Sequence, residues 1–454
     1  MSGLAVVGLG KLGACMAACF AARGFEVTGA DVDPRPVEAL NAGRAPVPEP
    51  GLQPLLDQAG GRLRATTSVV EAVAGADVAF VVVPTPSLAD GRFSLAYVRA
   101  AVAGIGAAWR GQPGRRVLAI TSTVLPGSME HGVRPVLEEA AGRGCGPDLG
   151  LCYNPEFIAL GSVVRDFLHP DLVLIGQSAG WAGDAVAEVY RRTCDPPPEI
   201  ARMSFASAEL AKIGLNSFVT TKISFANMLV ELCEELPGAD ADDVCRALGH
   251  DRRIGERALR GGLGYGGPCF PRDSVALAAL ARALGRPAAI PEAVDRVNDG
   301  VVERVLAHVT RAVPAGGRAA VLGLAYKPGT PIVECSHALA IARGLAAAGI
   351  AVTVHDETAA AAARPALGDG VLWADTPAAC VADADVAVLA SSDPTLAATL
   401  AGALAGRKRP LTVVDCWRLL DGADLPPAVR RVALGVGEPS PARRERLRSL
   451  WAEA

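Results

Sequence analysis

Short apolar runs alternate with longer helix-like segments through the first part of the chain. The apolar runs lie at residues 4–7, 26–31, 78–83, 117–121 and 172–175. Runs of this length that end in glycine or polar residues are typical of buried strands. Strands that alternate with helices predict an α/β fold, in which helices cover both faces of a parallel sheet.

The last third of the chain repeats this plan. Three segments repeat earlier ones in the same order: AVLGLA at 320–325 and AVVGLG at 5–10, GIAVTVHD at 349–356 and GFEVTGAD at 24–31, ADVAVLA at 384–390 and ADVAFVV at 76–82. A fourth apolar run at 412–415 takes the place of 118–121. The repeats predict two doubly wound, Rossmann-like domains of similar topology. Chance resemblance among strands rich in alanine and valine is the alternative.

Residues 204–235 form a long helix-like stretch in which Gly214 is the only glycine and proline is absent. At 1.5 Å per residue, thirty-odd residues make a helix of about 45–50 Å. We expect this helix to join the two domains as a spacer, and its apolar face to form a homodimer interface. A buried helix within one domain is the alternative.

The composition is that of a globular protein. The chain has 454 residues, 50% hydrophobic and 20% charged, which is the length of about three domains. Its net charge of −4 argues against nucleic acid as the main partner. No apolar run approaches the ~20 residues of a membrane span. The N-terminus lacks the basic region of a signal peptide, and Lys11 interrupts its apolar stretch, so we expect a cytoplasmic protein.

Cysteine usage points to the same compartment. The 11 cysteines are scattered without a C-x-x-C pair, and the 6 histidines do not cluster with them. A disulfide scaffold and a metal site are therefore both disfavoured. Reduced thiols fit a cytoplasmic protein.

A glycine motif follows the first predicted strand. Gly8, Gly10 and Gly13 form G-x-G-x-x-G: the first permits a tight turn, the second lets a pyrophosphate approach, and the third allows close packing of helix and strand. The helix that starts at Lys11 and Leu12 offers N–H groups to an anion. The carboxylate of Asp31, at the end of the next strand, would bind a ribose 2′-hydroxyl, which predicts NAD and not NADP. A glycine turn without a ligand is the alternative.

Residues 261–273 are the most informative segment, because five glycines there surround a single cysteine. A helix is expected to begin directly after Cys269, and the amides at its start would stabilise a thiolate nucleophile. Asp273 lies one turn further on, where it could move a proton. A buried structural cysteine is the alternative.

Three further polar residues are ambiguous by themselves. Lys212 and Asn216 are four positions apart on the central helix, hence on one face, where together they could stabilise an oxyanion. A lysine on a solvated helix face is the alternative. Glu156 follows a predicted strand, and alone it would be a surface carboxylate.

Taken together, the motifs resemble those of the UDP-glucose/GDP-mannose dehydrogenase family over nearly the whole chain. The motifs that carry the resemblance occur in order: GLGKLG at 8–13, VTGADVD at 27–33, PEPGL at 48–52, VPTPS at 83–87, TSTVLPGS at 121–128, NPEF at 154–157, AELAKIGLNSF at 208–218, GLGYGGPCFPRD at 262–273 and GLAYKPGT at 323–330.

The resemblance implies a four-electron oxidation of a sugar nucleotide C6 alcohol to a carboxylate, with two NAD⁺. It implies that Cys269 traps the C6 aldehyde as a thiohemiacetal, which is oxidised to a thioester and hydrolysed. Lys212 and Asn216 would stabilise oxyanions. Asp273 and Thr123 would hold water or relay protons, and Glu156 would assist hydrolysis.

The same resemblance implies the binding residues and the domain plan. Those for NAD are Gly8, Gly10, Lys11, Leu12, Gly13, Asp31, Arg35, Thr85, Pro86, Ser122 and Thr123. Those for the sugar nucleotide are Phe157, Lys212, Asn216, Tyr265, Gly266, Tyr326 and Lys327, with Arg253 reaching across a dimer to the partner's substrate. Residues 1–203 would be the NAD-binding domain, 204–300 the central helical dimerisation region with the cysteine loop, and 301–454 the sugar-nucleotide-binding domain.

Several positions depart from the family pattern. Leu160 and Glu334 replace an acidic residue and an arginine, Pro268 replaces a serine, and Arg272 replaces a lysine. Pro331 and Ile332 replace an acidic pair, and near the end either Trp417 or Arg418 takes a substrate role. UDP-glucose is the favoured substrate, with dTDP-glucose the main alternative and GDP-mannose or a UDP-HexNAc after it. A two-electron hydroxyacid dehydrogenase and an inactive sugar-nucleotide-binding protein are the competing classes.

Overall fold

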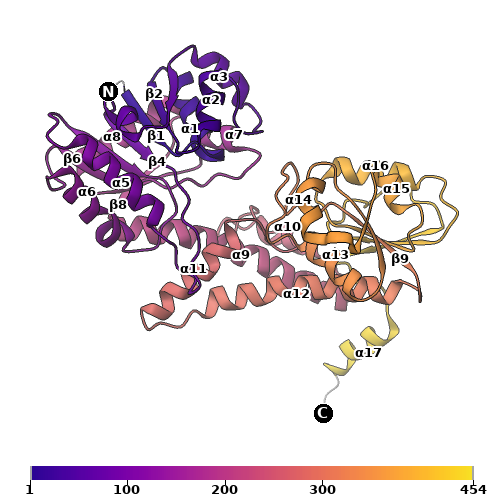
Figure 1. Ribbon diagram of the computed structural model, residues 1–454. Coiled ribbons are helices and arrows are strands. Elements are labelled where there is room, and N and C mark those ends of the chain that lie inside the picture. The colour runs from indigo at the N-terminus through magenta and orange to yellow at the C-terminus, as the bar shows by residue number, and fades with distance from the viewer. Residues whose placement is uncertain (1–2, 452–454) are drawn as a thin grey trace. The chain divides into compact units, whose positions relative to one another are not determined.

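The computed structural model describes residues 3–451 (Figure 1). The chain divides into two compact units, Met1–Leu215 and Asn216–Ala454, and each carries its own sheet.

The first unit is built on an eight-stranded sheet in the order β3-β2-β1-β4-β5-β6-β7-β8. Its strands are β1 (Gly3–Val7), β2 (Glu26–Ala30), β3 (Leu63–Thr66), β4 (Val78–Val81), β5 (Arg116–Ile120), β6 (Leu149–Tyr153), β7 (Val173–Gln177) and β8 (Ile200–Met203). All neighbouring strands are parallel except β6 and β7. The expected parallel direction is therefore wrong for β7 and β8. The chain enters β7 at the sheet end where β6 stops, so no crossover is needed there.

Helices cover both faces of this sheet, as the alternating pattern predicts. One apolar core lies under α1 (Lys11–Ala22), α3 (Leu52–Ala59), α7 (Val163–Leu168) and α8 (Gly180–Thr193). The other lies under α4 (Val69–Val73), α5 (Ala96–Trp109) and α6 (Arg134–Ala141). The strand β4 is buried at every position, which explains why its sequence is continuously apolar. The remaining elements are α2 (Pro34–Asn41) and a π-helical turn at Ser128–Val133.

The second unit repeats the strand order of the first. Its six parallel strands run β11-β10-β9-β12-β13-β14, which corresponds to β3-β2-β1-β4-β5-β6. They are β9 (Arg318–Leu322), β10 (Ala351–His355), β11 (Leu372–Trp373), β12 (Val386–Leu389), β13 (Leu411–Asp415) and β14 (Val429–Ala433). The predicted repeat of a doubly wound fold is confirmed.

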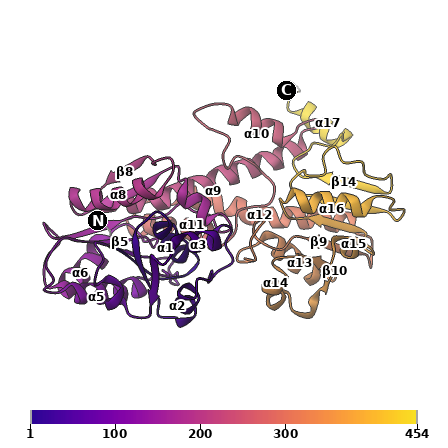
Figure 2. The same cartoon turned by 90° about the horizontal axis from the view of Figure 1, so that it is seen from above.

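The helices of the second unit again lie in layers (Figure 2). One core packs under α12 (Ala289–Ala312) and α13 (His337–Ala347), and the other under α15 (Pro377–Val381) and α16 (Pro394–Leu404). The other helices are α10 (Ala241–Gly249), α11 (Phe270–Ala283), α14 (Ala360–Leu367), a 3-10 turn at Gly368–Gly370, and α17 (Pro441–Ser449).

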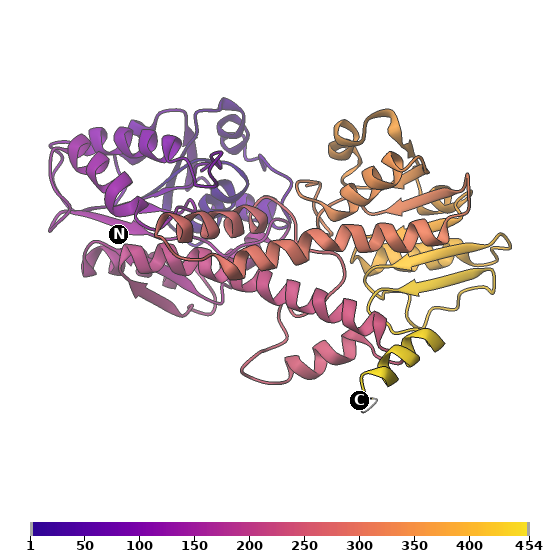
Figure 3. The same cartoon turned by 90° about the horizontal axis from the view of Figure 1, so that it is seen from below.

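The predicted long helix is α9 (Phe205–Glu235), which has 31 residues and continues through the boundary between the units (Figure 3). The predicted domain boundary at 203/204 lies just before α9, whereas that at 300/301 lies inside α12. The three-part division stays a prediction. Within residues 3–451, no helix combines the length and apolarity that a membrane span requires.

Candidate active site

The glycine turn between β1 and α1 has the shape that a bound pyrophosphate needs. Gly8 has a φ of +100°, and a Cβ there would lie 2.2 Å from the carbonyl oxygen of Val82. A Cβ at Gly13 would lie 1.8 Å from the carbonyl oxygen of Gly8, so the turn and α1 pack closely. A Cβ at Gly10 would meet no atom within 4 Å, so the backbone is open to a ligand there. The first intrahelical bond runs from the Ala14 amide to the Gly10 carbonyl, which leaves the amides of Lys11, Leu12 and Gly13 without an acceptor of this kind within α1.

The carboxylate of Asp31 binds the backbone of this turn. Its Oδ2 accepts a hydrogen bond of 2.6 Å from the Leu9 amide, and its Oδ1 accepts one of 2.9 Å from the Asp33 amide. Each carboxylate oxygen keeps a lone pair for a ribose hydroxyl. The guanidinium of Arg35 pairs with Asp33 and not with Asp31. The turn and its carboxylate therefore fit NAD.

The loops after β4 and β5 are tied together beside β1. Ser122 donates to the carbonyl of Val83 at 2.6 Å, and Thr85 donates to the carbonyl of Thr123 at 2.8 Å. Thr85, Pro86, Ser122 and Thr123 thus all follow the carboxyl ends of neighbouring strands, where doubly wound sheets bind their ligands.

Glu156, Phe157 and Lys212 come together in the first unit. The Lys212 ammonium donates a hydrogen bond of 2.7 Å to the backbone carbonyl of Glu156 and lies 4.5 Å from the centroid of the Phe157 ring. Lys212 is 5% exposed, so it does not lie on a solvated face. Burial raises the pKa of Glu156 to about 7, against a hydrogen bond from Tyr190 and the charge of Lys212, which both lower it.

The second unit brings Asn216, Cys269 and Asp273 together. Cys269 is exposed and caps the N-terminus of α11, as predicted. Its carbonyl accepts a hydrogen bond of 2.9 Å from the amide of Asp273. The Asp273 side chain is buried, and its Oδ2 accepts a hydrogen bond of 2.7 Å from Asn216 Nδ2. Its Oδ1 accepts no hydrogen bond among residues 3–451 and lies 3.6 Å from the Nε of Arg272, in an ion pair.

The glycine loop before Cys269 is fixed by hydrogen bonds to residues that lie outside the loop motif. Asn298 accepts from the amide of Tyr265 at 2.8 Å and donates to its carbonyl at 3.1 Å. The Tyr265 side chain is buried and donates to Asp295 at 2.5 Å, so it anchors the loop. The sequence reasoning missed Asn298 and Asp295, and no motif marks them.

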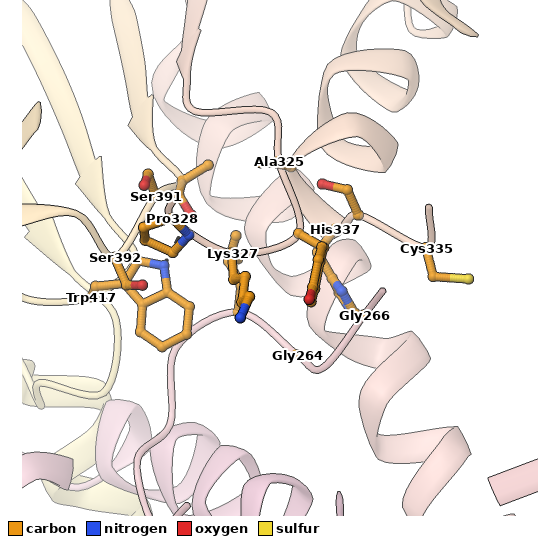
Figure 4. Close-up of a pocket in the computed structure, with 15 residues that line it drawn as sticks. Gly264, Gly266, Ala325, Lys327, Pro328, Cys335, His337, Ser391, Ser392 and Trp417 are labelled. Carbon is orange, nitrogen blue, oxygen red and sulfur yellow. Dashed lines mark hydrogen bonds between the residues drawn. The ribbon is translucent and has the colours of Figure 1, made fainter. Parts of the chain in front are cut away.

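A pocket of the second unit lies beside this loop (Figure 4). Three predicted substrate residues line it, namely Gly266, Tyr326 and Lys327, together with Ser391, Ser392 and Trp417. A Cβ at Gly266 would lie 2.3 Å from the carbonyl oxygen of Cys335, which explains the glycine.

The structure distinguishes between Trp417 and Arg418, the two candidate substrate residues near the end of the chain. Trp417 lines the pocket, and its indole N–H donates to the carbonyl of Ala390 at 2.9 Å. Arg418 is buried, and its guanidinium is bound by Asp242 at 2.7 Å and by two backbone carbonyls. Trp417 is therefore the one of the pair that lines the pocket, and its substrate role stays a prediction.

The other predicted positions lie apart from these clusters. Arg253 is on an exposed loop after α10 and pairs with Asp251 at 2.6 Å. Leu160 packs against the core of the first unit, and the carbonyl of Glu334 accepts from the Gly267 amide at 2.9 Å. In the part of the chain that the structure describes, no group of three or more His, Cys, Asp or Glu could hold a metal ion.

Comparisons with known proteins agree with the motifs. The chain is 38% identical over 395 residues to UDP-glucose 6-dehydrogenase AglM of Haloferax volcanii, covering 86% of this chain and 90% of that one. It is 30% identical over 419 residues to GDP-mannose 6-dehydrogenase of Azotobacter vinelandii, covering 89% and 95%. A UDP-glucose dehydrogenase structure from Pyrobaculum islandicum superimposes with a TM-score of 0.86 at 35% identity, covering 96% and 98%.

Three domain models of one family match the chain in order. They are the NAD binding domain at residues 2–194, the central domain at 206–300 and the UDP binding domain at 320–422. The chain therefore belongs to the UDP-glucose/GDP-mannose dehydrogenase family and is an NAD-dependent nucleotide-sugar dehydrogenase.

Proposed function

We propose that the protein oxidises the C6 alcohol of UDP-glucose to the carboxylate, in two steps of two electrons each. The observation that carries the proposal is the exposed thiol of Cys269 beside the buried Asn216–Asp273 pair. Relatives named as UDP-glucose 6-dehydrogenases, at 38% and 34% identity, support the choice of sugar nucleotide.

The proposed chemistry balances around the Cys269 sulfur. The glycine turn and Asp31 would hold NAD⁺, which would supply the hydride acceptor for each oxidation. After the first oxidation the thiol adds to the C6 aldehyde, giving a thiohemiacetal that keeps one hydrogen on C6. Loss of that hydrogen as hydride gives a thioester. Water then cleaves the C–S bond, and the acid leaves while the sulfur regains a proton.

The other proposed catalytic groups have distinct roles in this scheme. Lys212 and Asn216 stabilise the oxygen of C6 when it carries negative charge. Asp273, whose Oδ2 is fixed by Asn216, and Thr123 hold water or take a proton. Glu156 takes a proton from the water that attacks the thioester, a task suited to a carboxylate with a pKa of about 7.

We propose a homodimer in which α9 packs against a second copy. On the second-unit part of α9 and just after it, five large apolar side chains are exposed at helical spacing: Phe218, Phe225, Met228, Leu232 and Leu236. An exposed stripe of this kind is typical of an interface. Arg253, whose side chain is 88% exposed, would then reach the partner's substrate. We also propose a cytoplasmic location, because the eleven cysteines are scattered along the chain without a C-x-x-C pair.

The departures near the sugar nucleotide keep dTDP-glucose and GDP-mannose as alternatives. Trp417 presents apolar surface to the pocket at a position where the family pattern is polar, and this change bears on the sugar or the base, not on the thiol chemistry. Relatives named GDP-mannose 6-dehydrogenase are 30% to 33% identical.

The test is turnover of UDP-glucose, dTDP-glucose, GDP-mannose and a UDP-HexNAc with NAD⁺, with the NADH counted per sugar nucleotide consumed. Two NADH and a uronic acid product are expected with UDP-glucose. One NADH would instead indicate a two-electron dehydrogenase, and none with any substrate would indicate a binding protein.

A further inference from the structure

A buried tyrosine contacts the carboxylate of Glu156. Tyr190, on α8, is 1% exposed, and its ring packs 5.7 Å from that of Phe167, measured between centroids. Its hydroxyl contacts two side chains at once: it donates to Glu156 Oε1, and it lies 2.8 Å from Asn154 Oδ1. Neither the glycine motif nor the thiol loop contains Tyr190, and the reaction described above gives it no role.

The orientation of Asn154 limits what the hydroxyl can do. The Asn154 amide nitrogen donates to the carbonyl of Leu174 at 3.1 Å, so its oxygen faces Tyr190. The tyrosine hydroxyl has one proton and faces two acceptors when Glu156 is ionised. When Glu156 is protonated, the carboxyl proton can go to the tyrosine oxygen, while the tyrosine proton goes to Asn154. The same three side chains therefore accommodate both proton states of Glu156 by rotation of a single hydroxyl.

The backbone of Glu156 is fixed independently. The Lys212 ammonium binds its carbonyl at 2.7 Å, so the main chain is held from α9 and the carboxylate from α8. The other titratable groups near the carboxylate are the thiols of Cys19 and Cys194. Burial raises the pKa of both thiols, to about 12 for Cys194, so they stay neutral and do not compete for the proton.

We propose that Tyr190 is a positioning residue for Glu156: its hydroxyl, backed by Asn154, holds the carboxylate in one orientation while Glu156 gains and loses a proton. The catalytic part of this inference rests on the function proposed above. In thioester hydrolysis, Glu156 takes a proton from the attacking water. The tyrosine hydroxyl then turns to Asn154, and it returns to the carboxylate when that proton leaves.

The test is the variant Tyr190→Phe, which removes only the hydroxyl group. We expect kcat to fall roughly 10- to 100-fold, because the base in the hydrolysis step is misplaced. KM for the sugar nucleotide should fall with kcat, so that kcat/KM stays unchanged, because hydrolysis follows the oxidation steps. The first turnover of NADH should persist, and a thioester should accumulate on Cys269. In a Glu156→Gln background, the Tyr190→Phe change should have no further effect on kcat, because Tyr190 acts through Glu156.

Phe167→Leu is the matched control, since it loosens the packing around Tyr190 and leaves the hydroxyl in place. It should lower the melting temperature without thioester accumulation. Two outcomes would overturn the proposal, because each would indicate a structural role. The first is thioester accumulation in Phe167→Leu. The second is an equal loss of kcat from Tyr190→Phe in the wild-type and Glu156→Gln backgrounds.

A second measurement does not depend on turnover. The infrared difference spectrum between wild type and Glu156→Gln at pH 9 isolates the carboxylate stretching band of Glu156. This band should shift in Tyr190→Phe. It should shift in the opposite direction when 3-fluorotyrosine, a stronger donor of nearly the same shape, replaces Tyr190. A band that moves in neither variant overturns the contact. If the wild type forms no NADH from any sugar nucleotide, the proposed function fails, while the band still decides whether Tyr190 holds Glu156.

Discussion

Asn216 Nδ2 donates a hydrogen bond of 2.7 Å to Asp273 Oδ2, although the two residues lie 57 positions apart in the sequence. The bond joins α9 to the first turn of α11, directly beside the residue that caps this helix, Cys269. One oxygen of a buried carboxylate is thus fixed by a hydrogen bond, and the other lies 3.6 Å from the Nε of Arg272.

Asn216→Ala should destabilise the protein by about 1–3 kcal/mol, because a buried carboxylate loses its donor. Asp273→Asn should stay close to wild type in melting temperature, since the amide keeps the shape and relieves the buried charge. Its kcat should nevertheless fall about 100-fold or more, because the amide takes up no proton. Thermal melts and steady-state NADH formation measure both effects. Full activity in Asp273→Asn would exclude the proton-handling role.

Asp31→Ala should raise KM for NAD⁺ and reduce the preference for NAD⁺ over NADP⁺. The variant lacks an acceptor for the 2′-hydroxyl, and the charge that would repel a 2′-phosphate is gone. The amides of Leu9 and Asp33 also lose their acceptor, so a lower melting temperature is expected. Asp31→Asn is the control that retains an acceptor for those amides. If both cofactors give wild-type kinetics with Asp31→Ala, the carboxylate does not bind the ribose.

The stability of the protein should depend on the ionisation of Glu156. Burial raises its folded-state pKa from 4.5 to about 7, so the folded state binds this proton more tightly than the unfolded state does. Its contribution to the free energy of unfolding is therefore fully present below about pH 4.5 and is lost as the pH rises through 7. The loss amounts to about 3 kcal/mol. Urea unfolding of the wild type and of Glu156→Gln at pH 5 and pH 8 measures it: the difference between the two proteins should change by that amount. An unchanged difference would show that Glu156 is solvated.

Phe225→Glu should separate the proposed homodimer, because a charge would be buried in an apolar interface. Sedimentation velocity at micromolar concentration should show a dimer for the wild type and a monomer for the variant. Arg253→Ala should lower activity without changing the sedimentation. A monomeric wild type would remove both the interface and the proposed role of Arg253.

Much of the fold could be predicted because it follows from local patterns. The apolar runs identify most of the strands, and the order of the repeats gives the topology of the second sheet. The absence of proline, and of any glycine except Gly214, predicts α9. The reversal of β7 was missed because strand direction leaves no trace in hydrophobic periodicity. It depends on where the chain enters the sheet.

The site could be predicted where a motif is contiguous and not where it depends on packing. The glycine turn and the loop around Cys269 are read directly from the sequence. Tyr190 and Asn298 were missed because a single tyrosine or asparagine on a helix carries no spacing signal. The choice between Trp417 and Arg418 depends on the backbone: Arg418 has a φ of +57°, and its side chain is buried against Asp242.

Mass spectrometry of the Glu156→Gln variant tests the role of Cys269 most directly. The reaction with UDP-glucose and NAD⁺ is quenched during turnover, and the protein is then analysed. This variant should still form the thioester but hydrolyse it slowly. The intact protein should therefore gain the mass of the sugar-nucleotide acyl group, and peptide mapping should place the adduct on Cys269. A matched sample of Glu156→Gln combined with Cys269→Ala should show no adduct. No adduct on Cys269, together with wild-type rates of uronic acid formation in Cys269→Ala alone, would contradict the account.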